Sequence, residues 1–259
     1  MRGRRAGRGP RRARVLVIAG LDPTGGAGLV ADLDAVRSAG ADAWLVASAL
    51  TAQGPGGALG FEPATDGFVL DQIDALVEGG ERAGAVKTGM IGTALNSAAV
   101  AARLSEPPLA RTPLVVDPVL AASSGASLFD PEGAAAGEAF APLLARCRVA
   151  TPNLPELAAL TGLDVSTDEG ALRAARALPA RAVLVKGGHR PGAPEDLLVE
   201  GRRVTRFSGR RRPGAARGTG CRLAAALAAF LAQGAGLEEA VRRAKRLVER
   251  YLDRVAAGG

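Results

Sequence analysis

The stretch RVLVIAGLDPTGGAG, residues 14–28, joins a short apolar run to a loop that is rich in glycine. Val15–Ala19 is apolar throughout, which is typical of a strand buried on both faces. The glycines that follow let the backbone approach a ligand closely. Residues 27–39 then carry apolar side chains at helical spacing. The stretch therefore predicts a strand, a loop and a helix, which together begin a βαβ unit.

The same alternation continues along the chain. Strands are expected at residues 14–19, 43–49, 84–87, 113–117, 146–150 and 182–186, and a hairpin at 196–200 and 203–207. Helices are expected at residues 27–39, 67–78, 93–104, 131–145, 154–160, 168–178, 221–233 and 237–256. Buried strands that alternate with helices predict an α/β fold, with a mostly parallel sheet between helical layers.

The length of 259 residues and the 47% hydrophobic content indicate one large domain over residues 14–259. Residues 1–14 hold seven arginines and no acid, and the rest of the chain is balanced at 26 basic and 26 acidic residues. We interpret residues 1–13 as a disordered, solvated extension rather than an anion-binding arm, so nucleic acid is not an expected partner.

Export and membrane insertion are not expected. The apolar run of residues 15–19 is too short for a signal peptide, and no stretch approaches the ~18 apolar residues of a membrane span. Two distant cysteines, Cys147 and Cys221, and one histidine exclude a disulfide framework and a common zinc site. The composition therefore favours a cytoplasmic protein.

Parallel sheets bind ligands at the carboxyl ends of their strands, so the loops that follow the predicted strands are candidate binding loops. Seven of these loops are polar or rich in glycine: residues 20–28, 51–54, 87–90, 117–119, 151–156, 186–189 and 218–221.

The segment Arg217–Cys221, RGTGC, opens a long apolar helix. Its glycines, Gly218 and Gly220, allow backbone N–H groups to converge on an anion at the positive end of the helix, which suits a transferring phosphoryl group. The alternative is a glycine turn that leads into a helix. The same field is expected to favour the thiolate of Cys221, whereas Cys147 is expected to be a buried hydrophobe.

Lysine is rare, because only Lys87, Lys186 and Lys245 are lysines among 33 basic residues. Lys87 and Lys186 end predicted strands beside glycines, where a compact ammonium fits next to a phosphate. The alternative is that both side chains extend from the strand ends into water.

Asn153 and Glu156 stand three residues apart at a predicted helix start. They fit a capping box, and they also fit a site in which Glu156 reaches the water shell of Mg²⁺ on ATP while Asn153 orients the phosphates.

Asp32 and Gln53 together suit an aminopyrimidine, which needs paired donors and acceptors. Alone, Asp32 reads as a solvated helix charge. Met90 fits either a contact with a flat ring or the core.

Taken together, these loops resemble the hydroxymethylpyrimidine/phosphomethylpyrimidine kinases of thiamine biosynthesis, which belong to the ribokinase-like superfamily. The motifs that carry the resemblance, spread over residues 15–255, are AGLDPTGGAGLVADL (19–33), SALTAQ (48–53), KTGMIG (87–92), VVDPVLAASSG (115–125), TPNLPELAALTG (151–162), VLVKGGH (183–189) and GTGC (218–221). The resemblance implies a ribokinase-like three-layer α/β/α sandwich and a homodimer.

The resemblance also implies roles for individual residues. Contacts with the pyrimidine are implied for Gly20, Gly26, Asp32, Gln53 and Met90. Binding of MgATP is implied for Asp117, Asn153, Glu156, Lys186 and Thr219, with Glu156 reaching Mg²⁺ through water. The catalytic set is Gly218, Gly220, Cys221 and Lys186, in which Cys221 stands where sugar kinases of the superfamily place an aspartate as base.

Several positions depart from the family pattern. Leu21 replaces serine or threonine, Gly54 replaces asparagine, Arg217 replaces histidine, and Arg222 replaces a small hydroxylated residue. Arg210–Arg212 is an unusual basic run, and the histidine-rich tail of the family is missing.

The expected reaction moves the γ-phosphate of ATP onto 4-amino-5-hydroxymethyl-2-methylpyrimidine and then onto its monophosphate. Two alternatives remain open at this point. One is a pyridoxal kinase of the same superfamily, whose motif also ends in cysteine. The other is a homologue that binds the pyrimidine without catalysis, because the surroundings of Cys221 are altered.

Overall fold

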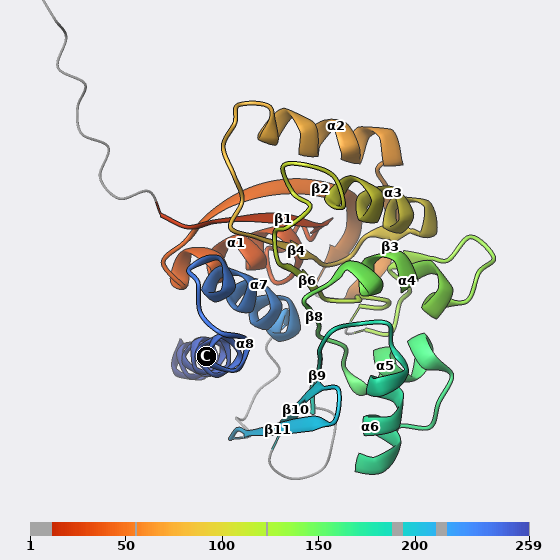
Figure 1. Cartoon of the computed structure of the whole chain (residues 1–259), viewed down its shortest axis with the longest axis vertical. Coiled ribbons are helices and arrows are strands. Elements are labelled where there is room, and N and C mark those ends of the chain that lie inside the picture. The colour runs from red at the N-terminus through yellow and green to blue at the C-terminus, as the bar shows by residue number, and fades with distance from the viewer. Residues whose placement is uncertain (1–11, 55, 123, 188–193, 211–216, 259) are drawn as a thin grey trace, which may run out of the picture.

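A nine-stranded sheet forms the centre of the computed structural model, which describes residues 12–54, 56–122, 124–187, 194–210 and 217–258 (Figure 1). Predictions that concern residues 1–11, His189, Arg211 and Arg212 lie outside these ranges. The strand order is β11-β10-β9-β8-β6-β4-β1-β2-β3. The strands of this sheet are β1 (Arg14–Leu21), β2 (Asp42–Gly54), β3 (Gly57–Pro63), β4 (Ala85–Thr88), β6 (Leu114–Val116), β8 (Val149–Ala150), β9 (Val183–Val185), β10 (Glu195–Glu200) and β11 (Arg203–Ser208).

Neighbouring strands from β2 to β9 run parallel, and the pairs at both edges of the sheet are antiparallel. A small second sheet pairs β5 (Gly92–Thr93) with β7 (Phe129–Asp130). The parallel centre confirms the predicted fold class. It also places the loops after β1, β4, β6, β8 and β9 at one edge of the sheet, where ligands of such folds bind.

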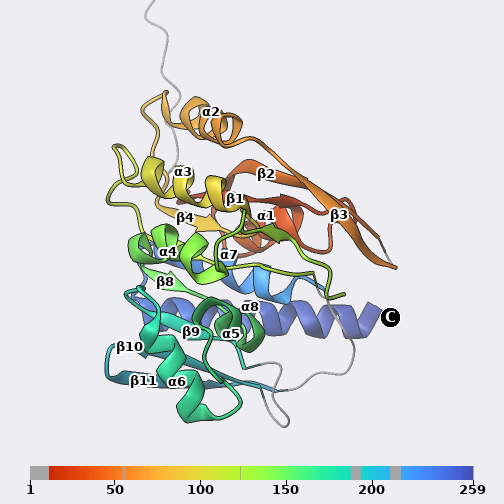
Figure 2. The same ribbon diagram turned by 90° about the vertical axis from the view of Figure 1, so that its right-hand side faces the viewer.

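Helices cover both faces of the sheet, as Figures 1 and 2 show. One layer contains α1 (Gly28–Ser38), α7 (Thr219–Ala232) and α8 (Leu237–Gly258). The other layer contains α2 (Asp66–Val77), α3 (Ala94–Leu104), α4 (Ala136–Arg146), α5 (Leu154–Thr161) and α6 (Asp168–Ala177). Along β1, Val15 and Val17 pack under the first layer and Leu16 and Ile18 under the second. Because side chains alternate along a strand, a strand covered on both faces has to be apolar throughout.

The largest difference from the sequence prediction lies between residues 50 and 63. Residues 51–54 were expected as a loop, but β2 continues to Gly54 and turns back as β3. β3 contains Gly57 and Gly60 and ends at Pro63, a composition that gives little strand signal and is tolerated at an edge. The hairpin extends beyond the rest of the sheet in Figure 2.

Smaller differences concern boundaries. The helix expected from residue 131 begins at Ala136, after a turn that includes Glu132 with a φ of 53°. Near the amino terminus, the carbonyl of Ala13 accepts a hydrogen bond from the Asp42 N–H at 2.9 Å, so sheet structure reaches one residue beyond the predicted boundary. Within the described ranges, no helix combines the length and apolar character needed to cross a membrane.

Candidate active site

The glycine loop after β1 lies directly against the start of α7. Gly218 has a φ of 69°, and a Cβ built on it would stand 2.2 Å from the carbonyl oxygen of Gly26. The backbone N–H of Gly28 lies near enough to the Cys221 sulfur to lower the pKa of its thiol, against the larger effect of burial. Only glycine fits at positions 218 and 28, because both adopt positive φ and both touch backbone atoms. The two glycine-rich motifs, almost 200 residues apart in sequence, therefore form one structure.

Lys186 lies between these two glycine-rich segments and the centre of the sheet. Its Nζ donates to Asp117 Oδ1 at 2.7 Å and lies 3.6 Å from Glu156 Oε2. A Cβ built on Gly220 would stand 3.1 Å from the same Nζ. The ammonium therefore lies at the amino terminus of α7, next to the backbone that the sequence predicted as an anion site.

The charged groups around Lys186 shift one another's pKa values. Burial opposes the charged form of Lys186, but the carboxylates of Asp117 and Glu156 outweigh it and raise the pKa of the ammonium. Burial also favours a neutral Asp117, yet Lys186 and Lys87 hold the pKa of this carboxyl below its usual value. For Glu156, burial raises the pKa more than Lys186 lowers it. The lysine is therefore a permanent cation at neutral pH, beside at least one carboxylate.

Asn153 and Glu156 form the predicted capping box at the start of α5. The Asn153 N–H donates to Glu156 Oε2 at 2.7 Å, and the Glu156 N–H donates to Asn153 Oδ1 at 2.8 Å. The Lys186 N–H donates to the Pro152 carbonyl at 2.9 Å, which ties this helix start to the end of β9. The capping interaction and a role at the ligand are compatible, because the box holds Glu156 beside Lys186.

Two features of this cluster suit a phosphate group with Mg²⁺. α7 begins at Thr219 and its first closing hydrogen bond runs from Arg222 N–H to the Gly218 carbonyl at 2.9 Å, so the N–H groups of the first turn have no acceptor within the helix. Asp117 Oδ2 is buried and has no hydrogen-bond partner among the described residues. Mg²⁺ in nucleotide sites binds to one or two carboxylates and to the phosphates, so Asp117 and Glu156 form a fitting donor set.

The protonation state of Cys221 differs from the one predicted from the sequence. The residue retains some solvent exposure, but desolvation by the surrounding protein raises the pKa of its thiol to about 11. Lys87 lowers this pKa, while Asp32 and Asp117 raise it. The group is a thiol at neutral pH, and the expectation that the helix field favours a thiolate is wrong because burial outweighs it. Cys147 is buried and free, as expected.

Asp32 and Lys87 form an ion pair with no solvent exposure on either side chain. Lys87 Nζ donates to Asp32 Oδ2 at 2.6 Å. Burial raises the pKa of Asp32 to about 6 against the opposing effect of Lys87. Asp32 is therefore not a solvated helix charge, and Lys87 neither reaches water nor has an exposed ammonium for a phosphate. A contact between Asp32 and a pyrimidine stays a prediction.

Gly20 and Met90 lie in contact near this pair. A Cβ built on Gly20 would stand 2.6 Å from Met90 Sδ, so a larger residue at position 20 would displace the methionine. Met90 is 6% exposed and packs with Ala49 and Leu128 in a small separate cluster. Met90 therefore belongs to this small core, and its contact with a flat ring stays a prediction.

Asp22 and Arg217 are two contributors that the sequence did not predict. The Asp22 carboxylate is buried and accepts hydrogen bonds from Thr24 N–H at 2.9 Å, Thr24 Oγ1 at 2.8 Å and Ala27 N–H at 3.0 Å. It therefore fixes the shape of the glycine loop. Arg217 Nη2 lies 3.7 Å from Asp22 Oδ2 and 2.6 Å from Gln53 Oε1. The Asp-Pro-Thr turn signal of residues 22–24 points to the first residue, but no local pattern points to Arg217.

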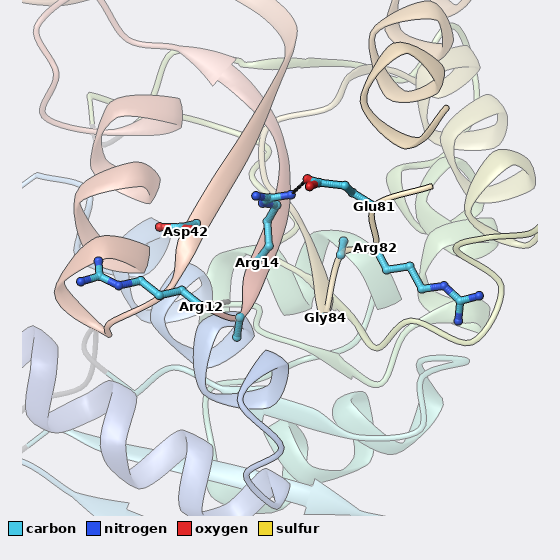
Figure 3. Close-up of a pocket in the computed structure, with 8 residues that line it drawn as sticks. Arg12, Arg14, Asp42, Glu81, Arg82 and Gly84 are labelled. Carbon is cyan, nitrogen blue, oxygen red and sulfur yellow. Dashed lines mark hydrogen bonds and ion pairs between the residues drawn. The ribbon is translucent and has the colours of Figure 1, made fainter. Parts of the chain in front are cut away.

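A hollow of about 260 Å³ lies elsewhere, at the amino ends of β1 and β4, as Figure 3 shows. Its lining includes Arg12, Arg14, Asp42, Glu81 and Arg82, and Arg14 pairs with Glu81 across it. This is the opposite edge of the sheet from the loops described above. We therefore place the candidate active site at the carboxyl edge, where the charged groups converge.

Solved structures with similar folds include three vitamin kinases. The pyridoxal kinase of Staphylococcus aureus in complex with AMP-PCP and pyridoxal has a TM-score of 0.81 at 27% identity, covering 93% of this chain and 87% of that chain. The pyridoxal kinase of Bacillus subtilis in complex with ADP has a TM-score of 0.79 at 28% identity, covering 91% and 89%. The phosphomethylpyrimidine kinase of Clostridium difficile 630 has a TM-score of 0.78 at 29% identity, covering 93% and 100%. The fold is thus that of the ribokinase-like kinases.

Sequence comparison narrows this class. A family model described as phosphomethylpyrimidine kinase matches residues 22–258. The hydroxymethylpyrimidine/phosphomethylpyrimidine kinase of Rhizobium meliloti is 40% identical over 239 residues, which cover 90% of this chain and 88% of that protein. The thiamine biosynthesis bifunctional protein ThiED of Geobacter sulfurreducens is 43% identical over 244 residues, but the chain spans only 48% of its length. The chain belongs to the phosphomethylpyrimidine kinase family.

Proposed function

We propose that the protein transfers the γ-phosphate of ATP to the hydroxymethyl group of 4-amino-5-hydroxymethyl-2-methylpyrimidine, and then to the resulting monophosphate, in thiamine biosynthesis. The observation that carries this proposal is the position of Lys186. Its ammonium lies between Asp117 and Glu156 and against Gly220 at the amino terminus of α7. Family membership supports the choice of pyrimidine.

The protein groups act mainly by holding charge and geometry. Lys186 and the free N–H groups at the start of α7 neutralise the phosphoryl oxygens during transfer. Mg²⁺ carried by ATP would be held by Asp117 and Glu156 and would neutralise charge on the phosphates. Cys221 keeps its proton at neutral pH, so it offers a hydrogen-bond donor to the transferring group rather than a base. Gly20, Gly26, Gln53 and Met90 provide the wall for the pyrimidine.

The test is ADP release from purified protein with MgATP and, in turn, hydroxymethylpyrimidine, its monophosphate and pyridoxal. We expect turnover with both pyrimidines and little with pyridoxal. The reaction without acceptor corrects for ATP hydrolysis, and Lys186→Met should lose turnover with every substrate. Turnover with pyridoxal alone would show that the protein is a pyridoxal kinase instead. The similarity to the two pyridoxal kinase structures is the reason for including this substrate. Calorimetry that shows pyrimidine binding without turnover would indicate a non-catalytic homologue.

We also propose a cytoplasmic homodimer without nucleic acid or membrane partners. Light scattering coupled to size exclusion measures the assembly directly. A mass equal to one chain would contradict the dimer.

A further inference from the structure

Arg217 connects three segments that are distant in sequence. Its Nη2 donates to Gln53 Oε1 at 2.6 Å, and its Nη1 lies 3.4 Å from the Gly54 carbonyl oxygen, both at the end of β2. The buried carboxylate of Asp22 in the glycine loop lies 3.7 Å from Nη2. Arg217 itself immediately precedes Gly218, the N-cap of α7.

These contacts determine how the Gln53 amide is oriented. A guanidinium only donates hydrogen bonds, so the atom of Gln53 that faces Arg217 has to be the oxygen. Gln53 Nε2 then donates to Thr51 Oγ1 at 2.9 Å, and the Thr51 hydroxyl donates to the Leu21 carbonyl at 2.9 Å. One N–H of the amide remains for a ligand, so Gln53 in this arrangement presents a donor.

Three departures from the family pattern lie in this one network. Arg217 is its centre, Gly54 contributes a carbonyl, and Leu21 contributes another. A Cβ built on Gly54 would meet no heavy atom within 4 Å, so the glycine leaves open space beside the guanidinium. Gly54 and Leu21 enter the network through backbone carbonyls alone, which any residue at those positions would supply, so Arg217 is the only one of the three that contributes its side chain.

We propose that Arg217 is a positioning residue that sets substrate specificity by holding the Gln53 amide with its N–H toward the acceptor nitrogen of the pyrimidine ring. This inference rests on the proposed function, since it concerns the same substrate. A residue with a role in phosphoryl transfer would instead affect the KM for ATP and kcat.

The test compares Arg217→Ala, Gln53→Ala and the double variant in steady-state assays with hydroxymethylpyrimidine and ATP. We expect each single variant to raise the KM for the pyrimidine about tenfold, with kcat within about threefold and the KM for ATP unchanged, because a ground-state contact is lost. The double variant should be no worse than Gln53→Ala, because Arg217 acts through Gln53. Arg37→Ala, which removes an exposed arginine of α1, is the matched control and should behave like the wild type.

Several outcomes would overturn the role of Arg217. These are an unchanged KM for the pyrimidine in Arg217→Ala, additive effects in the double variant, or a fall in kcat with a raised KM for ATP. Arg217→Lys guards against misfolding, because it keeps the charge but not the planar donor pair, and its KM should lie between those of wild type and Arg217→Ala. If the wild type accepts pyridoxal but not the pyrimidine, the proposed function fails, and the same comparison with pyridoxal still decides the role of Arg217.

Discussion

Cys221 shows that a residue's position and its chemical state are separate questions. The GTGC motif predicts that the cysteine begins a helix beside an anion site, and the structure places it at the start of α7. The helix field favours a thiolate, but desolvation is the larger effect and raises the pKa of the thiol to about 11. The proposed role of Cys221 is therefore that of a hydrogen-bond donor to the phosphoryl group, not that of a base.

The protonation of Cys221 can be measured by alkylation. We expect the rate of modification by iodoacetamide to rise about tenfold per pH unit from about pH 6 to about pH 9.5 without a plateau, since only the thiolate reacts and its fraction grows until the pKa is reached. Peptide mass spectrometry reads Cys221 and Cys147 separately, and buried Cys147, with a thiol pKa of about 12, is the internal control. A plateau near pH 8 at Cys221 would contradict the raised pKa.

Local sequence signals predicted the local geometry of some candidate site residues well. Asn153 and Glu156 follow a spacing rule within one turn of helix, and Gly218 and Gly220 follow the rule for a glycine-rich helix start. The Asp32–Lys87 pair joins residues 55 positions apart, and the Arg217–Gln53 contact joins residues 164 positions apart. Such pairs depend on the stacking of α1, β4, β2 and α7, which no local pattern encodes. Asp32, Lys87 and Gln53 could therefore be singled out from the sequence, but their partners, and Arg217 itself, could not.

At the scale of elements, the start of α7 has little room for side chains. Gly218 meets backbone atoms and has positive φ, whereas Gly220 lies within the helix and meets only the end of the Lys186 side chain. The two glycines thus serve different purposes, one for the fold and the other for the position of an ammonium. In the β2–β3 hairpin, by contrast, glycines made the sequence prediction fail, because they give little strand signal. β2 nevertheless continues to Gly54 and carries Gln53 with it.

Gly220→Ala should separate these purposes. Alanine favours a helix by about 1 kcal/mol over glycine, so the free energy of unfolding should not fall by more than about 1 kcal/mol. Its methyl group would displace the Lys186 ammonium, so we expect turnover to fall at least about tenfold, as for a misplaced catalytic group. Urea unfolding and ADP release measure the two effects. Gly67→Ala in the first turn of α2, where a Cβ meets nothing within 4 Å, is the matched control, and equal turnover in the two variants would contradict the displacement.

At the scale of the whole molecule, one buried ion pair joins the helical layer of α1 to the centre of the sheet. Asp32 and Lys87 have no exposed surface, and Asp32 Oδ1 has no hydrogen-bond partner among the residues described. A pair of this kind stabilises little by itself, but an unpaired member would be a charge buried in a low-dielectric interior. The pair therefore constrains which helix packs on which strand.

A double-mutant cycle tests this constraint. We expect Asp32→Leu and Lys87→Met each to lower the free energy of unfolding by about 3–5 kcal/mol, and the double variant to lose much less than the sum, because neither charge is then left unpaired. Urea denaturation gives the values. Arg203→Ala, which removes an exposed partner of Glu238, should change stability by less than about 1 kcal/mol. Additive losses in the double variant would show that the two side chains act independently.

The position of α7 in the chain has a consequence for biosynthesis. This helix packs on β1, β4 and β6 and against α1, yet it is made only after all nine strands of the main sheet. On the ribosome, the nascent sheet therefore has only α1 on this face, and the apolar surface that α7 covers, including Val115 of β6, stays open until α7 and α8 emerge. Before α7 is made, the polypeptide has its Asp22 loop but lacks the Thr219–Cys221 turn, so the proposed phosphoryl site and the cover over β4 and β6 are completed in the same step of synthesis.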